Sequence, residues 1–358
     1  AIGGAFGGRE DVSVQIVLAL AAWKLRRPVR MVWTRRESML AHHKRHPVTY
    51  HARLGASREG RLLAAEVEVL ADGGAYISTS MPVLANAMLF CTGPYEIPHV
   101  AVRGRVVYTN NPPCGAMRGF GALQANFCAE MQMNRLAEAL DMDPVELRRR
   151  NLIHAEARLP NGGRLPEGVE GLRKCLEAAA SESCWEAAGL KPVQTPGSHK
   201  RGGRGFACGW KNVGLGGGVP DAAETVIELY GRDQIERVLI RNAAADVGQG
   251  VQNVMAQIAA HVLHVPLSKI EFSGADTAQA PQTGTASASR LTVMVGNATL
   301  KAAQQALMAW QAEERPAIGR GLYRAPETHA IDRTGAEHFT HFSLGYTAAC
   351  AEVEVDLD

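Results

Sequence analysis

Glycine-rich turns that run into amphipathic helices are the feature that most constrains this chain. The pattern occurs four times in 358 residues, at positions 3–8, 118–121, 248–250 and 283–289. Apolar residues at helical spacing follow each turn and predict four helices, at residues 14–25, 122–140, 251–262 and 291–310. Unpaired amides at a helix start attract anions, because they lie at the positive end of the helix dipole. Any one such turn could simply reverse the chain, but four together indicate a large anionic ligand.

Between these helices, five stretches alternate apolar with polar residues and predict strands, at residues 63–70, 100–108, 225–230, 235–241 and 351–357. The combination indicates an α/β (α+β) fold, with helices packed on mixed or antiparallel sheets and not on one doubly wound sheet. Residues 191–204 are rich in Pro, Gly, Ser and basic residues and predict a linker or surface loop. We therefore expect two mixed-sheet domains, at residues 1–170 and 171–358. A polar stretch at residues 313–337 predicts a further loop.

Composition excludes several classes of protein. The 38 basic and 36 acidic residues nearly balance, so the chain lacks the one-signed field of a nucleic-acid binder. Its apolar stretches are far shorter than the roughly 20 residues that span a membrane. None of the seven cysteines stands at the close spacing of an iron-sulfur or zinc site. They are expected to be reduced, mostly buried thiols, which favours a cytoplasmic location.

Two familiar nucleotide sites and one metal site can be tested against the motifs. The turn at residues 3–8 lacks the G-x-G-x-x-G spacing and the preceding strand of a dinucleotide site. Arg9 and Glu10 stand where a P-loop needs Lys and then Ser or Thr. His42, His43 and His46 lie in a basic run without a nearby carboxylate or cysteine, so we expect them on the surface.

Five motifs, taken in their order along the chain, carry a family resemblance. They are Gly-Gly-Ala-Phe-Gly-Gly-Arg-Glu at residues 3–10, Gly-Pro-Tyr-Glu-Ile-Pro at 93–98, Ala-Met-Arg-Gly-Phe-Gly-Ala-Leu-Gln at 116–124, Gly-Gln-Gly at 248–250, and Thr-Gly-Thr-Ala-Ser-Ala-Ser-Arg at 283–290 followed by Val295 and Gly296. Over nearly its whole length the chain resembles the molybdenum-binding subunit of the xanthine dehydrogenase and aldehyde oxidase family. The resemblance implies two molybdopterin-binding domains, the first without its N-terminal part and the second without its C-terminal part.

The resemblance also implies a molybdopterin cofactor with molybdenum, in some bacterial members as the cytosine dinucleotide form, held by loop amides. The matching cofactor residues are Gly4, Ala5, Phe6, Gly7, Gly8, Arg118, Gly119, Gly248, Gln249, Gly250, Thr285, Ala286, Ser287 and Ser289. Of these, Phe6, Gly7 and Arg118 are expected to face the molybdenum through backbone or indirect contacts, and not as side-chain ligands.

Three residues match substrate-binding positions of the family. Glu10 matches a carboxylate that hydrogen-bonds purines in xanthine-oxidising members, and Phe120 matches an aromatic residue that packs on the substrate ring. Asn86 stands where purine oxidisers carry an arginine, and an amide cannot stabilise developing negative charge as a guanidinium does. These matches imply a nitrogen heterocycle, such as a purine or a nicotinate-like compound. From the residues alone, Glu10 could equally be a first-turn glutamate and Phe120 a core residue.

Family members hydroxylate their substrates with oxygen from water and use a glutamate base in a Gly-x-Gly-Glu motif. That motif does not occur in this sequence, so the catalytic base stays unassigned and the chain alone is expected to be inactive. The resemblance implies iron-sulfur clusters and FAD on partner subunits of a heterotrimer. The alternatives are an aldehyde or other dehydrogenase of the same family, and a cofactor-binding fragment without activity of its own.

Overall fold

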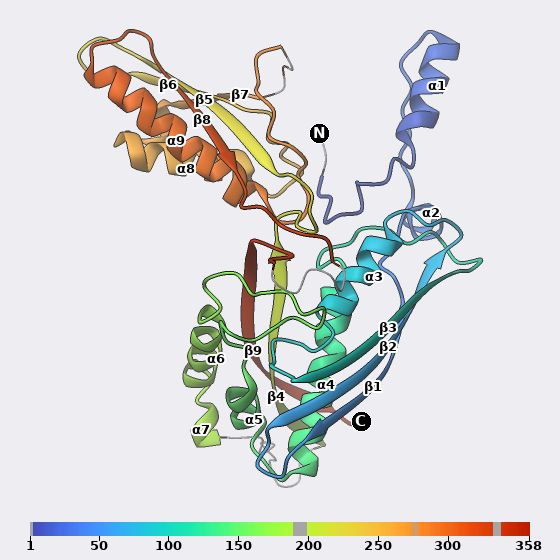
Figure 1. The fold of residues 1–358 in the computed structure, drawn as a ribbon. Helices are drawn as coiled ribbons and strands as arrows, with labels where there is room; N and C mark the ends of the chain where they lie inside the picture. Colours follow the sequence, from blue (N-terminus) through green and yellow to red (C-terminus); the bar gives the residue numbers. More distant parts are fainter. Residues whose placement is uncertain (1–2, 189–198, 275, 277, 332–337) are drawn as a thin grey trace. The chain divides into compact units, whose positions relative to one another are not determined.

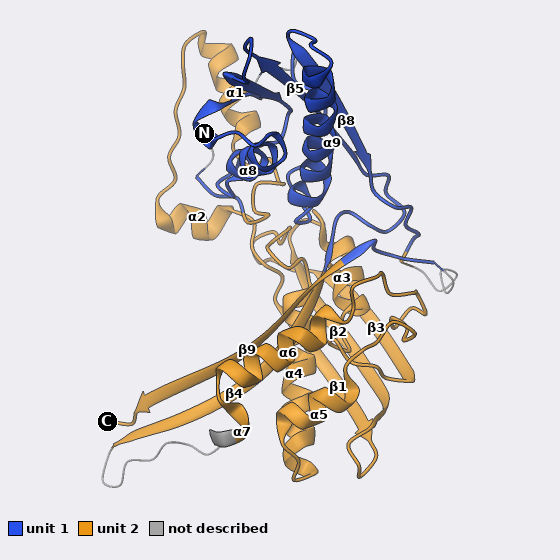
Figure 2. Cartoon of the chain, turned by 90° about the vertical axis from the view of Figure 1, so that its left-hand side faces the viewer, with its two compact units in different colours: residues 1–5, 212–330, 338–343 blue, residues 6–211, 331–337, 344–358 orange. Residues whose placement is uncertain are grey.

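The computed structural model describes residues 3–188, 199–274, 276, 278–331 and 338–358. The chain forms two compact units (Figure 2). Unit 1 comprises residues 1–5, 212–330 and 338–343, and unit 2 comprises residues 6–211, 331–337 and 344–358. Both units are discontinuous in sequence, and the division at residue 170 that we expect from composition stays a prediction.

Unit 2 contains a three-stranded mixed sheet in the order β1 (Val48–Ala56), β2 (Leu62–Gly74), β3 (His99–Tyr108). Strand β2 runs antiparallel to β1 and parallel to β3. Alternate residues of β2, including Val67 and Val69, are buried because successive side chains of a strand point to opposite faces. Helices α3 (Ser80–Leu89) and α4 (Ala122–Ala139) cover that face (Figure 1).

A second layer of unit 2 packs on the side of α4 that faces away from the three-stranded sheet. It consists of helices α5 (Pro144–Asn151), α6 (Gly171–Glu182) and α7 (Trp185–Ala188) and of the two-stranded sheet of β4 (Lys200–Val213) with β9 (Ser343–Asp356). The rings of Phe90 and Trp210 meet edge to face with centroids 5.2 Å apart, an arrangement that aromatic quadrupoles favour. These side chains belong to the largest apolar core of the unit.

Unit 1 is a four-stranded sheet in the order β7 (Ile270–Ser273), β6 (Arg237–Arg241), β5 (Ala222–Tyr230), β8 (Ala317–Arg324). Helices α8 (Val251–Leu263) and α9 (Leu291–Gln311) cover one face of it (Figure 1), and the 3₁₀ turn η1 (Leu267–Lys269) precedes β7. The face of α9 toward β8 carries small residues such as Ala298 and Ala302, both fully buried. Helix and strand backbones can therefore approach very closely.

The main sequence expectations for the fold are confirmed. The four predicted helices correspond to α1 (Gln15–Leu25), α4, α8 and α9. The five predicted strands overlap β2, β3, β5, β6 and β9, although the stretch 235–241 begins two residues before β6 and the stretch 351–357 ends one residue after β9. The sheets are mixed or antiparallel, as predicted. All seven cysteines are free thiols.

The first glycine turn departs from the expected pattern. Helix α1 begins at Gln15, seven residues after Gly8, so this turn does not run directly into a helix start. Asp11, which lies between the turn and the helix, accepts a hydrogen bond from Ser78 Oγ at 2.7 Å. Helix α1 buries none of its residues, and helix α2 (Arg35–Ala41) follows it with a capping box between Thr34 and Glu37.

Three further expectations need correction. The polar stretch 313–337 predicts a loop, but it contains strand β8. The strand forms because its small residues pack against α9. Of the predicted linker 191–204, residues 191–198 lie outside the described residues, and residues 200–204 belong to β4. His46 is buried at 2% exposure, with Nε2 2.8 Å from Ser80 Oγ, and is not a surface residue.

Candidate functional site

Two loops of unit 2 pack on each other at the predicted site residues. The amide of Arg118 donates to the carbonyl of Phe6 at 2.7 Å. Gly7 has φ +95°, and a Cβ there would lie 2.8 Å from the carbonyl oxygen of Ala116. Only glycine allows this approach of the two backbones, which explains why the first motif has glycine at position 7. The structure thus brings together Phe6, Gly7 and Arg118, which the motifs assign to one site.

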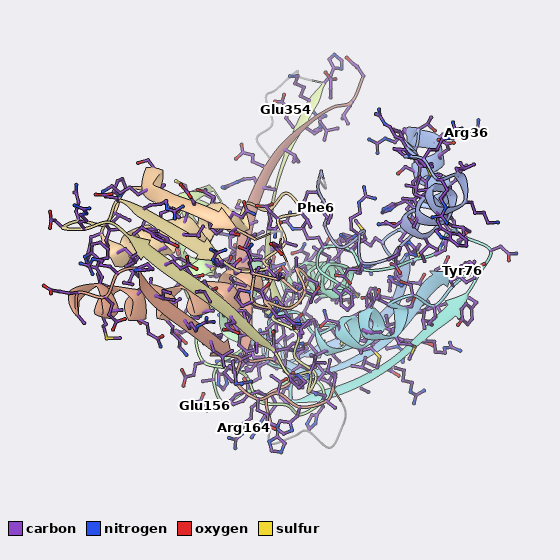
Figure 3. All side chains as sticks on the ribbon, turned by 90° about the horizontal axis from the view of Figure 1, so that it is seen from above. Phe6, Arg36, Tyr76, Glu156, Arg164 and Glu354 are labelled. Atoms are coloured by element: carbon purple, nitrogen blue, oxygen red, sulfur yellow. The ribbon has the colours of Figure 1, made fainter. Side chains whose placement is uncertain are left out.

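The backbone of these two loops is unusual in two respects. Phe6 and Phe120 adopt the left-handed conformation, at φ 52° and 49°, which costs a residue with a side chain free energy and is frequent at functional sites. The amides of Phe6, Gly7 and Gly8 donate to no acceptor among the described residues. The Phe6 side chain is 66% exposed (Figure 3). Arg118 is also exposed, so its guanidinium group is accessible to an anion.

Asn86 and Phe120 are directly connected. Asn86 lies on α3 at 4% exposure, and its Nδ2 donates to the carbonyl of Phe120 at 2.8 Å. Gly121 packs against the same helix, because a Cβ there would lie 2.4 Å from the carbonyl oxygen of Val83. Asn86 therefore holds the Phe120 turn in place within unit 2, a contact that spacing in the sequence does not reveal.

Glu10 follows the first turn, and its amide donates to the carbonyl of Gly7 at 3.1 Å. Desolvation by the surrounding protein, and then the neighbouring charge of Asp11, raise the pKa of the Glu10 carboxyl above its usual value. In its ionised form this carboxyl group is a hydrogen-bond acceptor.

Sequence reasoning missed the polar cluster around Asp11. His43 Nε2 lies 3.5 Å from Asp11 Oδ1, which also accepts from Ser78. A Cβ at Gly115 would lie 2.3 Å from Asp11 Oδ2, so Gly115 makes room for this carboxylate. The sequence around the histidines gives no sign of the pair, because their carboxylate partner comes from a distant segment. No group of metal-binding side chains occurs in the described ranges of the chain.

The Gly248 turn belongs to unit 1 and is closed by its own side chains. Asp246 Oδ1 accepts from the amides of Gly248 at 2.9 Å and Gly250 at 3.3 Å, and the bond to Gly248 is the main cause that lowers the pKa of Asp246. Gln249 bonds within the turn, with Oε1 accepting from the Val247 amide at 2.7 Å. Helix α8 begins directly after Gly250. We expected the amides at the start of α8 to be unpaired, but the Asp246 carboxylate already accepts hydrogen bonds from the amides of Gly248 and Gly250.

Gly248 also marks a close approach of two backbones in unit 1. A Cβ at Gly248 would lie 3.3 Å from the Cα of Gly4. The chain passes from unit 1 to unit 2 between Ala5 and Phe6. The structure thus brings Gly4 beside the Gly248 turn within unit 1, while Phe6 belongs to unit 2.

The loop at residues 283–289, also in unit 1, differs from the Gly248 turn in that several of its carbonyl groups, and not its amides, have hydrogen-bond partners among the described residues. The carbonyls of Thr283 and Thr285 accept from the Arg290 side chain, and that of Ala288 accepts from the Gly214 amide at 3.0 Å. Its amides, from residue 284 to 289, donate to no acceptor in the described part of the chain. Ala288 and Ser289 have φ 53° and 54°. Successive amides that face one way form a concave anion site, often called a nest.

A cavity of about 320 Å³ lies elsewhere in unit 2 and contains none of the predicted site residues. Its lining includes Tyr95, Glu96 and Glu156, and Glu156 is labelled in Figure 3. His154 bridges the two carboxylates, with Nδ1 2.8 Å from Glu156 and Nε2 2.9 Å from Glu96. The predicted loops and this cavity are therefore separate features.

The loops described above lie within two regions of the chain that match known protein domains. Residues 1–152 and residues 178–312 each match a molybdopterin cofactor-binding domain. The chain belongs to the xanthine dehydrogenase and aldehyde oxidase family of molybdopterin-binding proteins. Both matched ranges contain loops with amides that lack a protein acceptor among the described residues, as a cofactor held by its phosphate and pterin groups requires.

Relatives within this molybdopterin-binding family act on different substrates. The chain is 46% identical over 181 residues to the nicotinate dehydrogenase large molybdopterin subunit of Eubacterium barkeri, over 51% of this chain and 42% of that protein. It is 34% identical over 297 residues to a probable xanthine dehydrogenase subunit of Bacillus subtilis, over 83% of this chain and 39% of that protein. It thus spans about two-fifths of the length of both relatives.

A solved structure of the family agrees with the fold. The aldehyde oxidoreductase from Desulfovibrio desulfuricans superposes with a TM-score of 0.86 at 27% identity, over 99% of this chain and 40% of that chain. The helices of the described residues include none with the length and apolar character needed to cross a membrane.

Proposed function

We propose that this chain is the molybdopterin-binding part of a molybdenum hydroxylase that acts on a nitrogen heterocycle, nicotinate-like or purine. When bound, the cofactor supplies the redox centre at which an oxygen atom from water is transferred to a ring carbon. The chain's own contribution is to hold the cofactor and to orient the ring.

The unpaired amides support the first of these roles. Those of Phe6, Gly7 and Gly8 and those of residues 284–289 have no protein acceptor among the residues described, and Arg118 adds an exposed cation. We assign the phosphate and pterin contacts to these groups. In the turn of Gly248, Gln249 and Gly250, Asp246 already accepts from two of the amides. We therefore propose that this turn serves the site through Gly248, which allows the close approach of Gly4.

Glu10 is the observation that carries the choice of substrate. Its carboxylate follows the first turn and can accept a hydrogen bond from a ring N–H group, which an aldehyde does not offer. Phe120 would pack on the ring while Asn86 holds the Phe120 turn. The similarity to a nicotinate dehydrogenase subunit points the same way.

The similarity to an aldehyde oxidoreductase structure supports a second candidate, an aldehyde dehydrogenase of the same family. A third candidate is a cofactor-binding chain without activity of its own. For the assembly, we propose separate iron-sulfur and FAD subunits, since the two relatives are themselves named as subunits. We also propose that the assembly is cytoplasmic. The cytosine dinucleotide form of the cofactor belongs to the same proposal.

The test is the substitution Glu10→Gln in the enzyme produced together with its neighbouring subunits. We expect kcat/KM for the active heterocycle to fall by about tenfold to a hundredfold, the effect of losing one hydrogen bond to a charged group. The rate with benzaldehyde should not change. Nicotinate, hypoxanthine and xanthine make up the panel of heterocycles.

Glu66→Gln, an exposed glutamate of β2, is the control and should leave all rates unchanged. Turnover of aldehydes alone would replace the proposal by the second candidate. Absence of turnover from a fully assembled, molybdenum-loaded enzyme would favour the third.

A further inference from the structure

We infer that Arg290 and Asp221 act as a positioning pair, holding the loop at residues 283–289 in its anion-binding conformation before any cofactor is present. The inference rests on the proposed function of that loop. It concerns two residues that contribute almost nothing to the surface of the site, because their side chains are 1% and 4% exposed.

The first step is the position of the guanidinium group. Arg290 Nε donates to Asp221 Oδ1 and Oδ2 at 2.9 and 3.0 Å. Nη1 donates to the carbonyls of Thr283 at 2.6 Å and Thr285 at 2.8 Å, and Nη2 donates to the carbonyl of Ala222 at 3.1 Å. One side chain therefore connects the beginning of β5 to both ends of the turn around Gly284.

The second step is the effect of these bonds on the loop. The guanidinium group takes up the carbonyls of Thr283 and Thr285, which turns the intervening peptide groups so that their amides have no protein acceptor in the described part of unit 1. A side chain on Gly284 would clash with this arrangement, because its Cβ would lie 3.0 Å from Arg290 Nη1. Residue 284 also has a φ of +71°, so both its backbone conformation and its closeness to Arg290 favour glycine there.

The third step is the attachment of the loop to the rest of unit 1. The amides of Gly214, Glu224 and Ala243 donate to the carbonyls of Ala288, Gln282 and Pro281 at 3.0 to 3.1 Å. These three amides report directly on the loop, since each loses its acceptor when the loop leaves the sheet. Between the bonds at positions 282 and 288, the loop is held by the Arg290 side chain.

Lysine cannot replace arginine here, because a single ammonium group cannot reach a carboxylate and three carbonyls in a planar fork. The variant Arg290→Lys keeps the charge and loses the geometry. Arg241→Lys is a matched control in the same sheet. Arg241 pairs with Glu228 at 2.7 Å, and its other bonds go to Ser273 and Gln279, outside the loop at residues 283–289.

Two measurements test the inference. In the 358-residue chain without cofactor, hydrogen exchange at the Gly214, Glu224 and Ala243 amides should become about tenfold faster or more in Arg290→Lys, which corresponds to the loss of one charge-assisted hydrogen bond. Exchange in the middle of α9 should stay as in the wild type. In the assembled enzyme, molybdenum and pterin per chain should fall by a similar factor, and Arg241→Lys should show neither change.

Unchanged exchange at the three reporter amides would overturn the inference, as would equal acceleration throughout α9, which indicates a general loss of stability. Normal cofactor content despite a released loop would also overturn it. If Arg290→Lys does not fold, Asp221→Asn, which keeps the shape of the pair, gives the same readouts. A wild-type assembly without molybdenum would contradict the proposed function, while the exchange measurement would still test the positioning pair.

Discussion

At the residue scale, the buried charge of Arg148 is held by several hydrogen-bond partners inside unit 2. Arg148, at 0% exposure, donates from Nε to Glu130 at 2.8 Å and from Nη2 to Asn134 at 2.8 Å. Glu130 in turn accepts from the Cys208 amide at 3.0 Å and from the Tyr95 hydroxyl. Burial is also the main cause that raises the pKa of Tyr95. The network connects α4, α5 and β4 inside unit 2.

Arg148→Met should destabilise unit 2 by about 3–5 kcal/mol, because it leaves the Glu130 carboxylate buried without its counter-charge. The measurement is the free energy of unfolding from urea titration. Arg150→Met, on the same helix but exposed and paired with Glu146, is the control, with an expected loss below about 1 kcal/mol. Equal losses in the two variants would contradict this account of the network.

His154 should make stability depend on pH near neutrality. Its hydrogen bond to Glu156 is the main cause that raises its pKa, and the bond to Glu96 adds to it. A raised folded-state pKa stabilises the protein fully below about pH 6.5, the unfolded value, and this contribution is lost as the pH rises through the folded value. Because the side chain is 52% exposed, the effect should stay below about 1 kcal/mol.

We expect the difference in unfolding free energy between wild type and His154→Gln to shrink as the pH rises from about 6.5 through the raised folded-state pKa of His154. His51→Gln, an exposed histidine of β1, serves as the control. A difference that does not change with pH would show that the carboxylates leave His154 unperturbed.

At the scale of elements, the packing of β8 on α9 depends on the absence of side chains. A Cβ at Gly321 would lie 1.9 Å from the carbonyl oxygen of Ala298, and one at Gly319 would lie 2.0 Å from that of Ala302. Backbone atoms cannot give way as a flexible side chain can. The two glycines therefore determine how close the helix lies to the sheet in unit 1.

Gly321→Ala should destabilise unit 1 by about 1–3 kcal/mol or more, the usual effect of overfilling a packed core. Gly205→Ala, on β4 with no atom within 4 Å of the added Cβ, should change stability by less than about 0.5 kcal/mol. Thermal unfolding followed by circular dichroism measures both. A tolerated Gly321→Ala would mean that α9 can move away from β8 without loss.

At the scale of the whole molecule, the chain consists of two units, each with its own apolar cores, and each holds part of the predicted cofactor loops. Unit 2 contains Phe6, Gly7, Gly8, Arg118 and Gly119, and unit 1 contains the Gly248 turn and the loop at residues 283–289. The family assignment comes from both halves of the sequence.

The 358-residue chain by itself should reduce no electron-accepting dye with nicotinate, xanthine or an aldehyde. The expectation follows from the sequence, which contains neither a Gly-x-Gly-Glu motif nor closely spaced cysteines for a cluster. The same assay on the chain co-produced with its neighbouring subunits is the control. Turnover by the purified chain would contradict the expectation directly.

The local pattern of the sequence was sufficient for the periodic elements and the family. Alternation and helical spacing predicted β2, β3, α4 and α8, because both depend on which face of an element is buried. The glycine motifs predicted turns of the chain, and the structure shows that Gly7 and Gly121 in these turns also allow close backbone approaches.

Only the tertiary structure determined which amides are available to a ligand. The Gly248 turn and the loop at residues 283–289 are both glycine-containing turns that precede a helix. Yet Asp246 accepts hydrogen bonds from amides of the first, whereas Arg290 donates hydrogen bonds to carbonyls of the second. Arg290 meets Asp221 across 69 positions of the chain, and Asn86 meets Phe120 across 34. Such partners are selected by packing between distant segments, for which local spacing carries no signal.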